Sequence, residues 1–408
     1  MSGMNGEIID ISSTFTQIAH SVFKKNKKKY EIYPLKTELW DKIKKEEGFQ
    51  GSDQQEMRIV SLPGGYGFSG SNASFPTARA NTAINPKITT KRYYGIAMLD
   101  TKSIAESMRD EGSFERVLER SHRDMQRMIQ NGSSLALYHT NISNELVLGV
   151  IASGGVSGSA GTGWTLTFDT FKPELFHENQ CVTIEDGNTD VFYVHSVGTS
   201  SIVVKRADSG SQVPAATDEV FLEGGDGNAF TGLKAATASS GTLYNVTIGG
   251  QWKSITKDKS GRSLNPDMIF NLCVEVENHC GVMPNFLICS KEQFQKINEY
   301  VEARHETRVT SEKGKLGHKK TSLFIKGTEL EIMWDRHCDA DRVYVLHTDY
   351  LKFVKSPMSG IVQDNGSMLQ PDYINGTDTY LMVYRLYGEL FIEPYAVGLL
   401  YNLNTTVE

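Results

Sequence analysis

The chain has 408 residues, of which 39% are hydrophobic and 22% charged, and its formal net charge is −7. This composition is typical of a globular protein of two or three domains and excludes a disordered chain. It also excludes a protein whose whole surface binds nucleic acid, because neutralising phosphates requires a basic face. No stretch approaches the roughly 18 uninterrupted apolar residues of a membrane span. Residues 1–16 lack the cationic start and apolar core of a signal peptide, so we expect the product to stay in the cytosol.

Residues 1–72 show little periodicity and are predicted to form an N-terminal arm. One short amphipathic segment, 35–47, carries Leu39, Trp40 and Ile43. A dense basic run precedes it and consists of Lys24, Lys25, Lys27, Lys28 and Lys29. Such a run is usually a solvated surface. The alternative is an inward-facing contact with nucleic acid or with an acidic assembly partner.

Residues 73–99 are predicted to form an extended two-stranded loop. Residues 82–85 are the expected turn, and residues 88–96 alternate with the period of a strand. An isolated two-stranded ribbon is marginal in water, and this loop can bury few of its own residues. We therefore expect a neighbouring subunit to hold it. The candidate interface residues of the loop are Lys87, Lys91, Arg92 and Tyr94.

A long amphipathic helix is predicted to follow at 113–131. A shorter helix at 100–111 is expected to stop at Gly112, so that Ser113 is the N-cap of the long one and Asn131-Gly132 its end. An apolar stripe covers one side of the long helix, and it consists of Phe114, Val117, Leu118, Met125, Met128 and Ile129. The charged positions that we expect to face solvent or a neighbouring subunit include Glu115, Glu119 and Arg123.

Short alternating strands are predicted between residues 164 and 222, after a joint of small residues at 153–163. They predict a small β-barrel or sandwich inserted into the main fold, with Asp186-Gly187 as a hairpin signal. Asp186, Asn188 and Asp190 imitate the start of a calcium loop. However, Val191 and Val197 stand where its glycine and its closing glutamate belong, so we predict no metal site there.

Helices and strands alternate after residue 265. Asn265-Pro266 is the expected start of a helix that ends at Gly281, and residues 286–289 are predicted to be a buried strand. Ser290 and Gln293 fit the capping box of a further helix. Strands are then predicted at 323–325, 330–334, 342–346, 351–354 and 380–392. The fold class is therefore α+β.

Candidates for catalysis are few. His337, Cys338, Asp339 and Asp341 cluster on a short loop between two strands, and we interpret this cluster as a surface turn. The five cysteines are an odd number without a disulfide-like pattern. Cys273, Cys280 and Cys289 also lack the Cys-x-x-Cys spacing of a zinc site, so we predict buried thiols. Known catalytic motifs are absent from fitting contexts. We predict no enzyme, no catalytic or metal-binding residue and no cofactor.

The order of these elements resembles that of the major capsid proteins of tailed bacteriophages, the Hong Kong 97-like fold. Residues 73–99 resemble the extended loop of that family, and 113–131 resemble its spine helix. The segment 230–252 resembles the return to the main fold, and 265–346 resembles the axial domain. Two departures are that residues 1–60 show no clear helix and that only some members carry a β insertion.

This resemblance implies a division of the chain into seven parts. They are an N-terminal arm at 1–72, an extended loop at 73–99, a peripheral domain with the spine helix at 100–163, an inserted β domain at 164–227, a return to the peripheral domain at 228–264, an axial domain at 265–378, and a C-terminal strand of the peripheral and axial sheet at 379–408.

The resemblance also implies a function. It implies a head subunit that assembles with itself into hexamers and pentamers of an icosahedral shell around double-stranded DNA, without sequence-specific DNA binding and without a membrane. Scaffolding, portal and decoration proteins are implied partners, and assembly is implied in the host cytoplasm. The alternative is an encapsulin-type nanocompartment with the same fold, although the β insertion weighs against it. A β-rich enzyme or a secreted binding protein is disfavoured, because a catalytic constellation and a signal sequence are absent.

Overall fold

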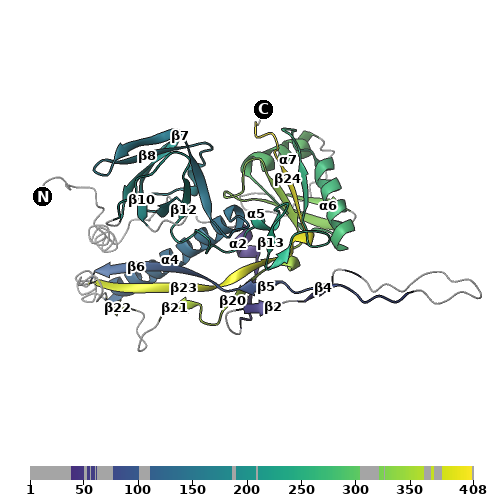
Figure 1. The fold of residues 1–408 in the computed structure, drawn as a ribbon, viewed down its shortest axis with the longest axis horizontal. Coiled ribbons are helices and arrows are strands. Elements are labelled where there is room, and N and C mark those ends of the chain that lie inside the picture. Colours follow the sequence, from purple (N-terminus) through teal and green to yellow (C-terminus); the bar gives the residue numbers. More distant parts are fainter. Residues whose placement is uncertain are drawn as a thin grey trace, which may run out of the picture. The chain divides into compact units, whose positions relative to one another are not determined.

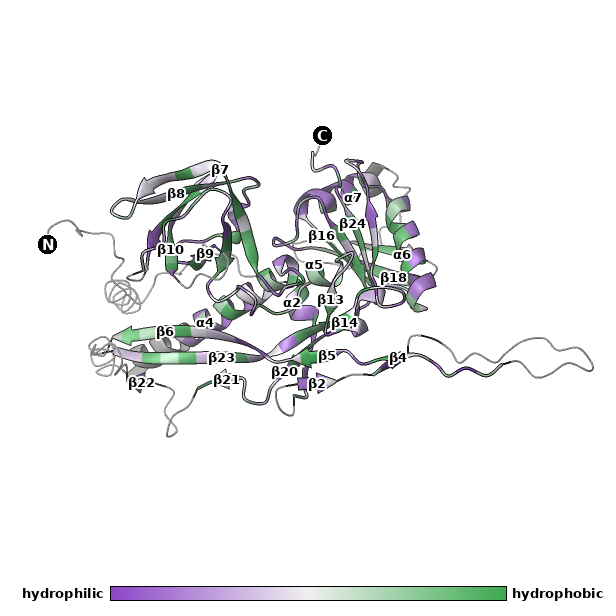
Figure 2. Ribbon diagram, in the orientation of Figure 1, coloured by the Kyte–Doolittle hydropathy of each residue, from purple (hydrophilic) through white to green (hydrophobic). Residues whose placement is uncertain are grey.

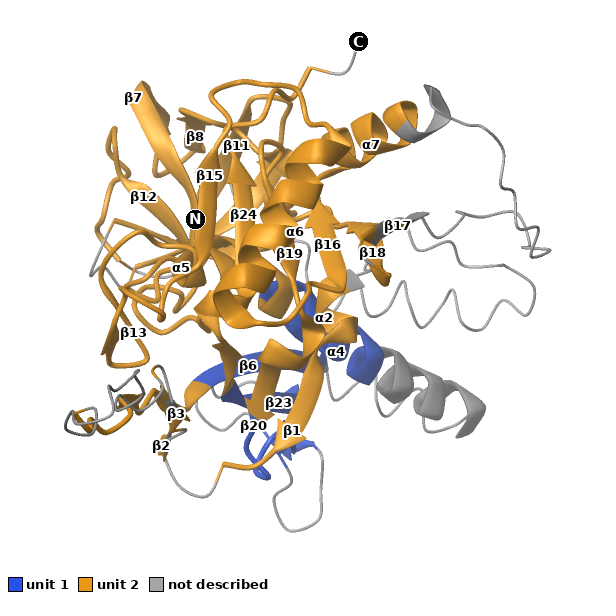
Figure 3. Cartoon of the chain, turned by 90° about the vertical axis from the view of Figure 1, so that its right-hand side faces the viewer, with its two compact units in different colours: residues 1–36, 92–132, 355–388 blue, residues 37–91, 133–354, 389–408 orange. Residues whose placement is uncertain are grey.

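The computed structural model describes residues 38–49, 53–55, 57–59, 61, 77–100, 111–185, 190–207, 210–303, 321–325, 327–362, 369–371 and 379–406. The chain divides into two compact units (Figure 3). Unit 1 comprises residues 1–36, 92–132 and 355–388, and unit 2 comprises residues 37–91, 133–354 and 389–408. Helix α4 (Glu111–His139) and strand β23 (Thr379–Ile392) continue from one unit into the other. No helix in the described part of the chain is both long and apolar enough to span a membrane.

Unit 1 is a sheet built around β23. Strands β6 (Lys91–Asp100), β21 (Gly360–Ile361) and β22 (Gln370–Pro371) all pair with β23. Leu99 of β6, Met125 of α4 and Met382 of β23 form the centre of a buried cluster, which places α4 on one face of this sheet. The residues of β6 alternate accordingly, with Gly95 buried and Arg92, Tyr94 and Ile96 exposed. The strand pattern of residues 88–96 is thus confirmed, but its second half belongs to this sheet.

Helix α4 is longer than the sequence predicts. Ser113 lies inside it rather than at its N-cap, and the expected shorter helix falls largely on residues 101–110, outside the described residues. The helix also continues through Asn131-Gly132 to His139. Gly132 does not end the helix. It allows α4 to pack closely against Tyr93, because a Cβ at this position would lie 1.9 Å from the Tyr93 hydroxyl.

The apolar stripe of α4 is partly confirmed. Met125 and Ile129 are 1% and 5% exposed, but the prediction for Met128 is wrong, because 53% of it is exposed. Met128 precedes Ile129 by one residue, and a rotation of about 100° per residue carries it off the buried side. The side chains of Phe114, Val117 and Leu118 lie outside the described part of the chain.

A two-stranded ribbon lies in unit 2. Strand β2 (Asp53–Gln55) pairs with β5 (Lys87–Thr89), and β3 (Arg58–Ile59) pairs with β4 (Ala83–Ile84). The expected loop boundary at residue 73 is therefore wrong, because the outgoing strand begins twenty residues earlier. The expected turn at 82–85 is also wrong, since it contains β4. Figure 1 shows the two strands running side by side away from β5.

The β insertion is a closed six-stranded barrel with the strand order β10-β11-β8-β7-β12-β9. Its strands are β7 (Val147–Ser159), β8 (Gly163–Phe168), β9 (Cys181–Ile184), β10 (Val191–Val197), β11 (Ser201–Arg206) and β12 (Glu219–Leu222). The expected joint at 153–163 is wrong: it is the end of β7, a turn and the start of β8. The second half of β7 consists mainly of glycine and serine, so it has no alternating pattern by which the sequence would reveal a strand. The pairing of β7 with β8 shifts between Ile151 and Val156, around Gly154 at φ 73°. The hairpin signal at Asp186-Gly187 lies outside the described residues.

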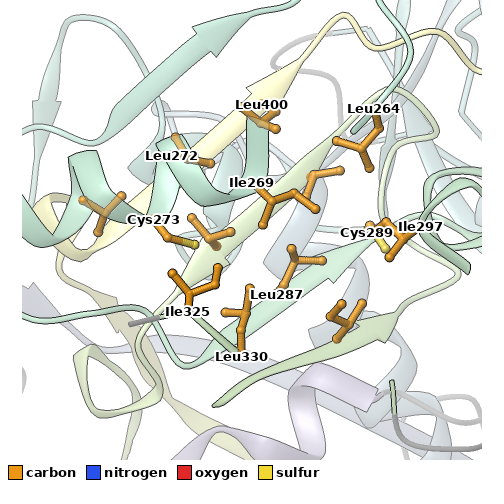
Figure 4. Packing of buried hydrophobic residues seen from close by; sticks show 14 of the residues in the cluster. Leu264, Ile269, Leu272, Cys273, Leu287, Cys289, Ile297, Ile325, Leu330 and Leu400 are labelled. Atoms are coloured by element: carbon orange, nitrogen blue, oxygen red, sulfur yellow. The ribbon is translucent and has the colours of Figure 1, made fainter. Parts of the chain in front are cut away.

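A six-stranded mixed sheet forms the rest of the core of unit 2. Its order is β15 (Ile255–Asp258), β24 (Val397–Tyr401), β19 (Val343–Leu346), β16 (Phe286–Cys289), β18 (Thr328–Trp334) and β17 (Thr321–Ile325). Helices α6 (Pro266–Cys280) and α7 (Lys291–Ala303) contribute Ile269, Leu272, Cys273 and Ile297 to its buried cluster (Figure 4). Figure 2 shows hydrophobic residues along the strands and hydrophilic residues on both helices.

The helix signals at Asn265 and Gly281 are confirmed, and the capping box at Ser290 is confirmed only in part. The Asn265 side chain accepts a hydrogen bond from Met268 N at 2.9 Å, and Gly281 ends α6 at φ 77°. Ser290 Oγ accepts from Gln293 N at 3.3 Å, but Gln293 Nε2 donates to Ala340 O and Asn404 O, so only half of the capping box forms.

The short elements of unit 2 complete the fold. They are α2 (Glu38–Lys42), β1 (Lys44–Glu47), α5 (Leu233–Ala236), β13 (Thr242–Leu243), β14 (Val246–Thr247) and β20 (Leu351–Lys355), which continues into unit 1. Leu39, Trp40 and Ile43 are buried as expected, although the helix that carries the first two has only five residues.

Two expected domain boundaries need correction. The barrel begins at Val147, not at residue 164, and the mixed sheet takes β15 and β24 from outside 265–378. Parallel pairing of β15 with β24 joins segments that are 143 residues apart at Ile255 and Gly398, which no local pattern can indicate. The seven-part division as a whole stays a prediction.

Candidate assembly surface

The root of the ribbon is anchored in the core of unit 2. Ile88 of β5 is fully buried and packs in a cluster with Phe49, Trp252, Val354 and Phe391. Lys87 N donates a hydrogen bond to Tyr244 O at 2.8 Å. The sequence analysis missed this anchor, although the isoleucine in a polar loop was its signal.

Two ion pairs fix the direction in which the ribbon leaves this root. Lys87 Nζ lies 2.8 Å from Asp53 Oδ2 on the opposite strand. Arg58 of β3 binds Glu393 with two hydrogen bonds, of 3.0 and 2.7 Å, and its guanidinium lies over the Phe391 ring. The Glu393 side chain is only 6% exposed, so this bidentate pair is screened less than the surface pairs that are worth about 0 to 1 kcal/mol. The ribbon is therefore held at its root and along the first residues beyond it.

Lys91 also has a partner in its own chain. Its Nζ donates to Gly227 O at 3.0 Å. Lys87 and Lys91 were expected to serve a subunit interface, and that expectation stays a prediction. Both cations already contact the chain that carries them, so an interface would have to share or replace these contacts.

Arg92 and Tyr94 belong to the exposed face of the unit 1 sheet and not to the ribbon. The Tyr94 and Tyr387 hydroxyls share a hydrogen bond of 2.7 Å, and their rings meet edge to face at 5.8 Å. The guanidinium groups of Arg92 and Arg385 lie 5.8 and 5.5 Å from the centre of the Tyr387 ring. The structure therefore joins two predicted residues of β6 to two residues of β23 that the sequence analysis did not single out.

The remaining predicted residues are not brought to this face by the described structure. Arg123 is exposed on α4. Glu115 and Glu119 lie in the same helix, but their side chains are outside the described part. Lys24, Lys25, Lys27, Lys28 and Lys29 are outside the described residues as well.

Glu389 is a buried acid on β23 that sequence reasoning missed. It is 3% exposed, and its Oε1 accepts hydrogen bonds from Thr231 N at 2.7 Å and Leu390 N at 2.9 Å. Burial raises the pKa of Glu389 to about 8, against the opposing effect of these two donors and of Lys91. The carboxyl group is thus largely protonated at neutral pH.

The expected surface turn at 337–341 is wrong, because its side chains lie in a buried polar network. His337 is 1% and Cys338 7% exposed. His337 Nδ1 is 2.8 Å from Ser134 Oγ, and His139 Nε2 donates to His337 O at 2.9 Å. Burial lowers the pKa of His139 to about 4 and that of His337 well below its usual value, so both imidazoles are neutral. The extension of α4 to His139 buries this loop.

Asp339 links the network to the barrel segment after β8. Lys172 Nζ contacts its Oδ1, and Arg342 Nε lies 3.2 Å from its Oδ2. Burial raises the pKa of Asp339, but its neighbours His139, Lys172 and Arg342 together outweigh this effect and lower the pKa. The network fastens α4, the mixed sheet and the barrel to one another.

This network does not have the geometry of a catalytic triad. Asp335 Oδ1 lies 3.9 Å from His337 Nδ1, the nitrogen that already faces Ser134, whereas a catalytic triad needs serine and acid on opposite ring nitrogens. All three side chains are buried. Within the described residues, no group of three His, Cys, Asp or Glu side chains is placed to hold a metal ion.

Three of the five cysteines have the buried environment that their sequence context predicts. Cys273, Cys289 and Cys338 are buried, Cys181 and Cys280 are partly buried, and all five are free thiols. Burial raises the pKa of Cys181 to about 11 and that of Cys273 to about 12, which leaves both thiols protonated.

The fold of the chain is similar to that of a solved structure. The Cyanophage A-1(L) capsid asymmetric unit matches with a TM-score of 0.57 and 10% identity, covering 94% of this chain and 98% of that one. Residues 223–363 match the family model of the SU10 major capsid protein. The chain therefore has the fold of a phage capsid protein.

This fold is α+β and Hong Kong 97-like, with a small inserted β-barrel. Two further structures align with TM-scores below 0.5. Gordonia phage Cozz has a TM-score of 0.47 at 10% identity and covers 94% of this chain and 91% of that one. The holo-SrpI encapsulin complex from Synechococcus elongatus PCC 7942 has a TM-score of 0.45 at 9% identity and 96% coverage of both chains. No curated protein matches the sequence. The fold assignment therefore depends on the cyanophage capsid.

Both matches, the family model and the cyanophage structure, are to capsid proteins. In capsid proteins the exposed surfaces matter for assembly, because the subunits form a shell through contacts between copies. The ribbon and the exposed face of the unit 1 sheet are therefore candidate assembly surfaces.

Proposed function

We propose that this protein is the major capsid protein of a tailed bacteriophage and self-assembles into hexamers and pentamers of an icosahedral shell that encloses double-stranded DNA. The observation that carries this proposal is the ribbon. Its strands pair only two by two, and Met57 on it is 66% exposed. A two-stranded ribbon is marginal in water, so it requires support beyond its root, and a neighbouring copy supplies that support in a shell.

The proposed role is structural and involves no turnover. The network around His337 is closed to solvent, and the family model is that of a capsid protein. Confinement holds the genome without sequence-specific contacts, so an acidic subunit is compatible with this role. We propose assembly in the host cytoplasm, with scaffolding, portal and decoration proteins as further partners. The basic run at 24–29 is proposed to face the interior.

Lys87, Lys91, Glu115, Glu119 and Arg123 are proposed as assembly residues together with Arg92 and Tyr94. Each exposed ion pair contributes only about 0 to 1 kcal/mol. A shell repeats every such contact over all its copies, so small contributions accumulate.

Electron microscopy of the purified, expressed protein tests the proposal. We expect closed shells, and sedimentation should show hexamers, pentamers or shells. Shells isolated from infected cells should contain nuclease-protected DNA. Protein cargo in place of DNA would make the protein an encapsulin-type compartment. A chain that stays monomeric over a wide concentration range and shows hydrolase activity would refute the proposal.

A further inference from the structure

The exposed face of the unit 1 sheet is a preorganised recognition surface. We call it the arginine–tyrosine face; it consists of Arg92, Tyr94, Ile96, Met358, Arg385 and Tyr387. The hydrogen bond between Tyr94 and Tyr387 and the two guanidinium groups on the Tyr387 ring hold its centre in place. Arg385 Nε also donates to Met358 O at 2.8 Å. Side chains that are already ordered lose little entropy on binding.

The composition of the face points to a protein partner. Tyr94, Ile96 and Met358 are 45%, 57% and 60% exposed, and tyrosine, methionine and arginine are enriched in protein interfaces. Neither Arg92 nor Arg385 has a carboxylate partner among the described residues. Phosphate alone would leave the isoleucine and methionine uncovered. A partner with both carboxylates and an apolar side chain would pair with the two guanidinium groups and also cover the isoleucine and the methionine.

The barrel of a second copy has this complementary chemistry. Residues 147–227 contain 11 acidic and three basic residues, a formal charge of −8, against −7 for the whole chain. Apart from the barrel, the chain is therefore slightly basic. Charge complementarity favours contact between the barrel of one copy and the cationic surface of another.

One edge of the barrel presents an apolar side chain beside carboxylates. Val213, in the loop before β12, is 61% exposed. Next to it, Gln212 Nε2 donates to Ile184 O at 2.6 Å and to Glu185 Oε2 at 3.0 Å, which holds the loop against the exposed Glu185. Ala215 N donates to Asp218 Oδ2 at 2.8 Å and closes the other side of the loop. We call residues 210–218 with Glu185 the acidic barrel edge.

We propose that the arginine–tyrosine face of one copy binds the acidic barrel edge of a second copy in the shell. Val213 packs against Ile96 and Met358, while Glu185 and Asp218 pair with the guanidinium groups of Arg92 and Arg385. The same surfaces are then used on different copies, which makes the contact heterologous and repeatable. This inference rests on the proposed assembly into shells.

A charge-reversal rescue tests the contact. Arg92→Glu and Glu185→Arg should each lower the yield of shells at least tenfold, because like charges then face each other across the contact. The combination of both substitutions in one chain should restore shells to within about threefold of the unmodified protein. Lys291→Glu, an exposed reversal at the start of α7, is the matched control and should assemble normally. Circular dichroism of the unassembled subunits verifies that each variant folds.

A normal yield of shells from the Arg92→Glu variant would overturn the inference. A double variant that still forms few shells would also overturn it. Normal shells of Arg92→Glu that retain less DNA would also overturn it, in favour of a nucleic-acid contact. A second measurement avoids charge reversal: a photo-crosslinking amino acid at position 94 should link to residues 210–218 of another copy. Links to residues 62–76 instead would assign the face to that segment of a neighbouring copy and overturn the inference. If the unmodified protein forms no shells, the proposed function fails, and this outcome is distinct from all of the others.

Discussion

Glu389 shows how a single residue depends on its tertiary surroundings. The side chain lies on a strand that the sequence predicts, and its alternation does not reveal that an acid points into the core. Thr231, 158 residues away, supplies a backbone donor at 2.7 Å that makes this burial tolerable. A buried acid with a backbone donor and no strong ion pair is a proton-sensitive group.

We expect Glu389 to make the stability of the subunit depend on pH. Burial raises its pKa from 4.5 to about 8, so between these two values the folded state keeps a proton that the unfolded state releases. The free energy of unfolding should therefore fall as pH rises through this window and level off above it, by up to about 1.4 kcal/mol per pH unit.

The variant Glu389→Gln keeps an oxygen that accepts from Thr231 N and Leu390 N but cannot ionise. Urea unfolding of unassembled subunits at several pH values should show a flatter profile for this variant and higher stability above pH 7. Identical slopes for both proteins would contradict the burial of an ionisable group. Glu299→Gln, at an exposed position of α7, is the control and should follow the unmodified protein.

Helix α4 illustrates what a sequence pattern conveys about an element. Periodicity placed Met125 and Ile129 on the buried side, but it also placed Met128 there and stopped the helix at Asn131-Gly132. Both errors have one cause. The tight approach of β6 selects glycine at 132 and limits the buried side to a narrower strip, and β6 is not visible in the sequence of the helix.

One substitution at two positions tests this assignment. Met125→Asp should destabilise the subunit by about 3 kcal/mol or more, because it places a carboxylate in the cluster with Leu99 and Met382. Met128→Asp, at a position that is 53% exposed, should change stability by less than about 0.5 kcal/mol. Thermal unfolding of unassembled subunits compares the two. Equal losses of stability would place the buried side of α4 elsewhere.

The barrel should fold as an independent element, provided that its first strand is present. Residues 147–227 include all six strands, and their alternating side chains fill the interior. Expressed alone, this fragment should unfold cooperatively and give a β-type circular dichroism spectrum. Residues 164–222 lack β7, which leaves β8 and β12 with open edges. This shorter fragment should aggregate or remain unfolded, and a well-folded short fragment would show that β7 is dispensable.

At the scale of the whole molecule, the ribbon and the uneven charge distribution are the main features relevant to assembly. The ribbon is anchored by Ile88 and by the Arg58–Glu393 pair within its own subunit. The barrel carries the entire net negative charge. A shell can use both features because every copy presents the same surfaces to its neighbours.

Shortening the ribbon should separate folding from assembly. Replacement of residues 61–82 by a short Gly-Ser turn keeps β2 to β5 and the anchor at Ile88. We expect the secondary structure of the subunit to be unchanged and closed shells to be lost or to dissociate at lower temperature, as measured by circular dichroism, sedimentation and electron microscopy. Shells of normal size and heat stability would show that the ribbon is not an assembly element.

The sequence by itself determined the fold class, the order of the helices and strands after residue 265, and the helix caps at Asn265 and Ser290. These properties follow from local periodicity, turn chemistry and composition, which act over a few residues. Only the tertiary structure decided where the ribbon begins, that β7 belongs to the barrel, that α4 reaches His139, and that residues 337–341 are buried. It also brought Arg92 and Tyr94 to Arg385 and Tyr387. Each of these depends on contacts between segments far apart in the chain, whose free energy outweighs the local preference of glycine, serine and polar loops.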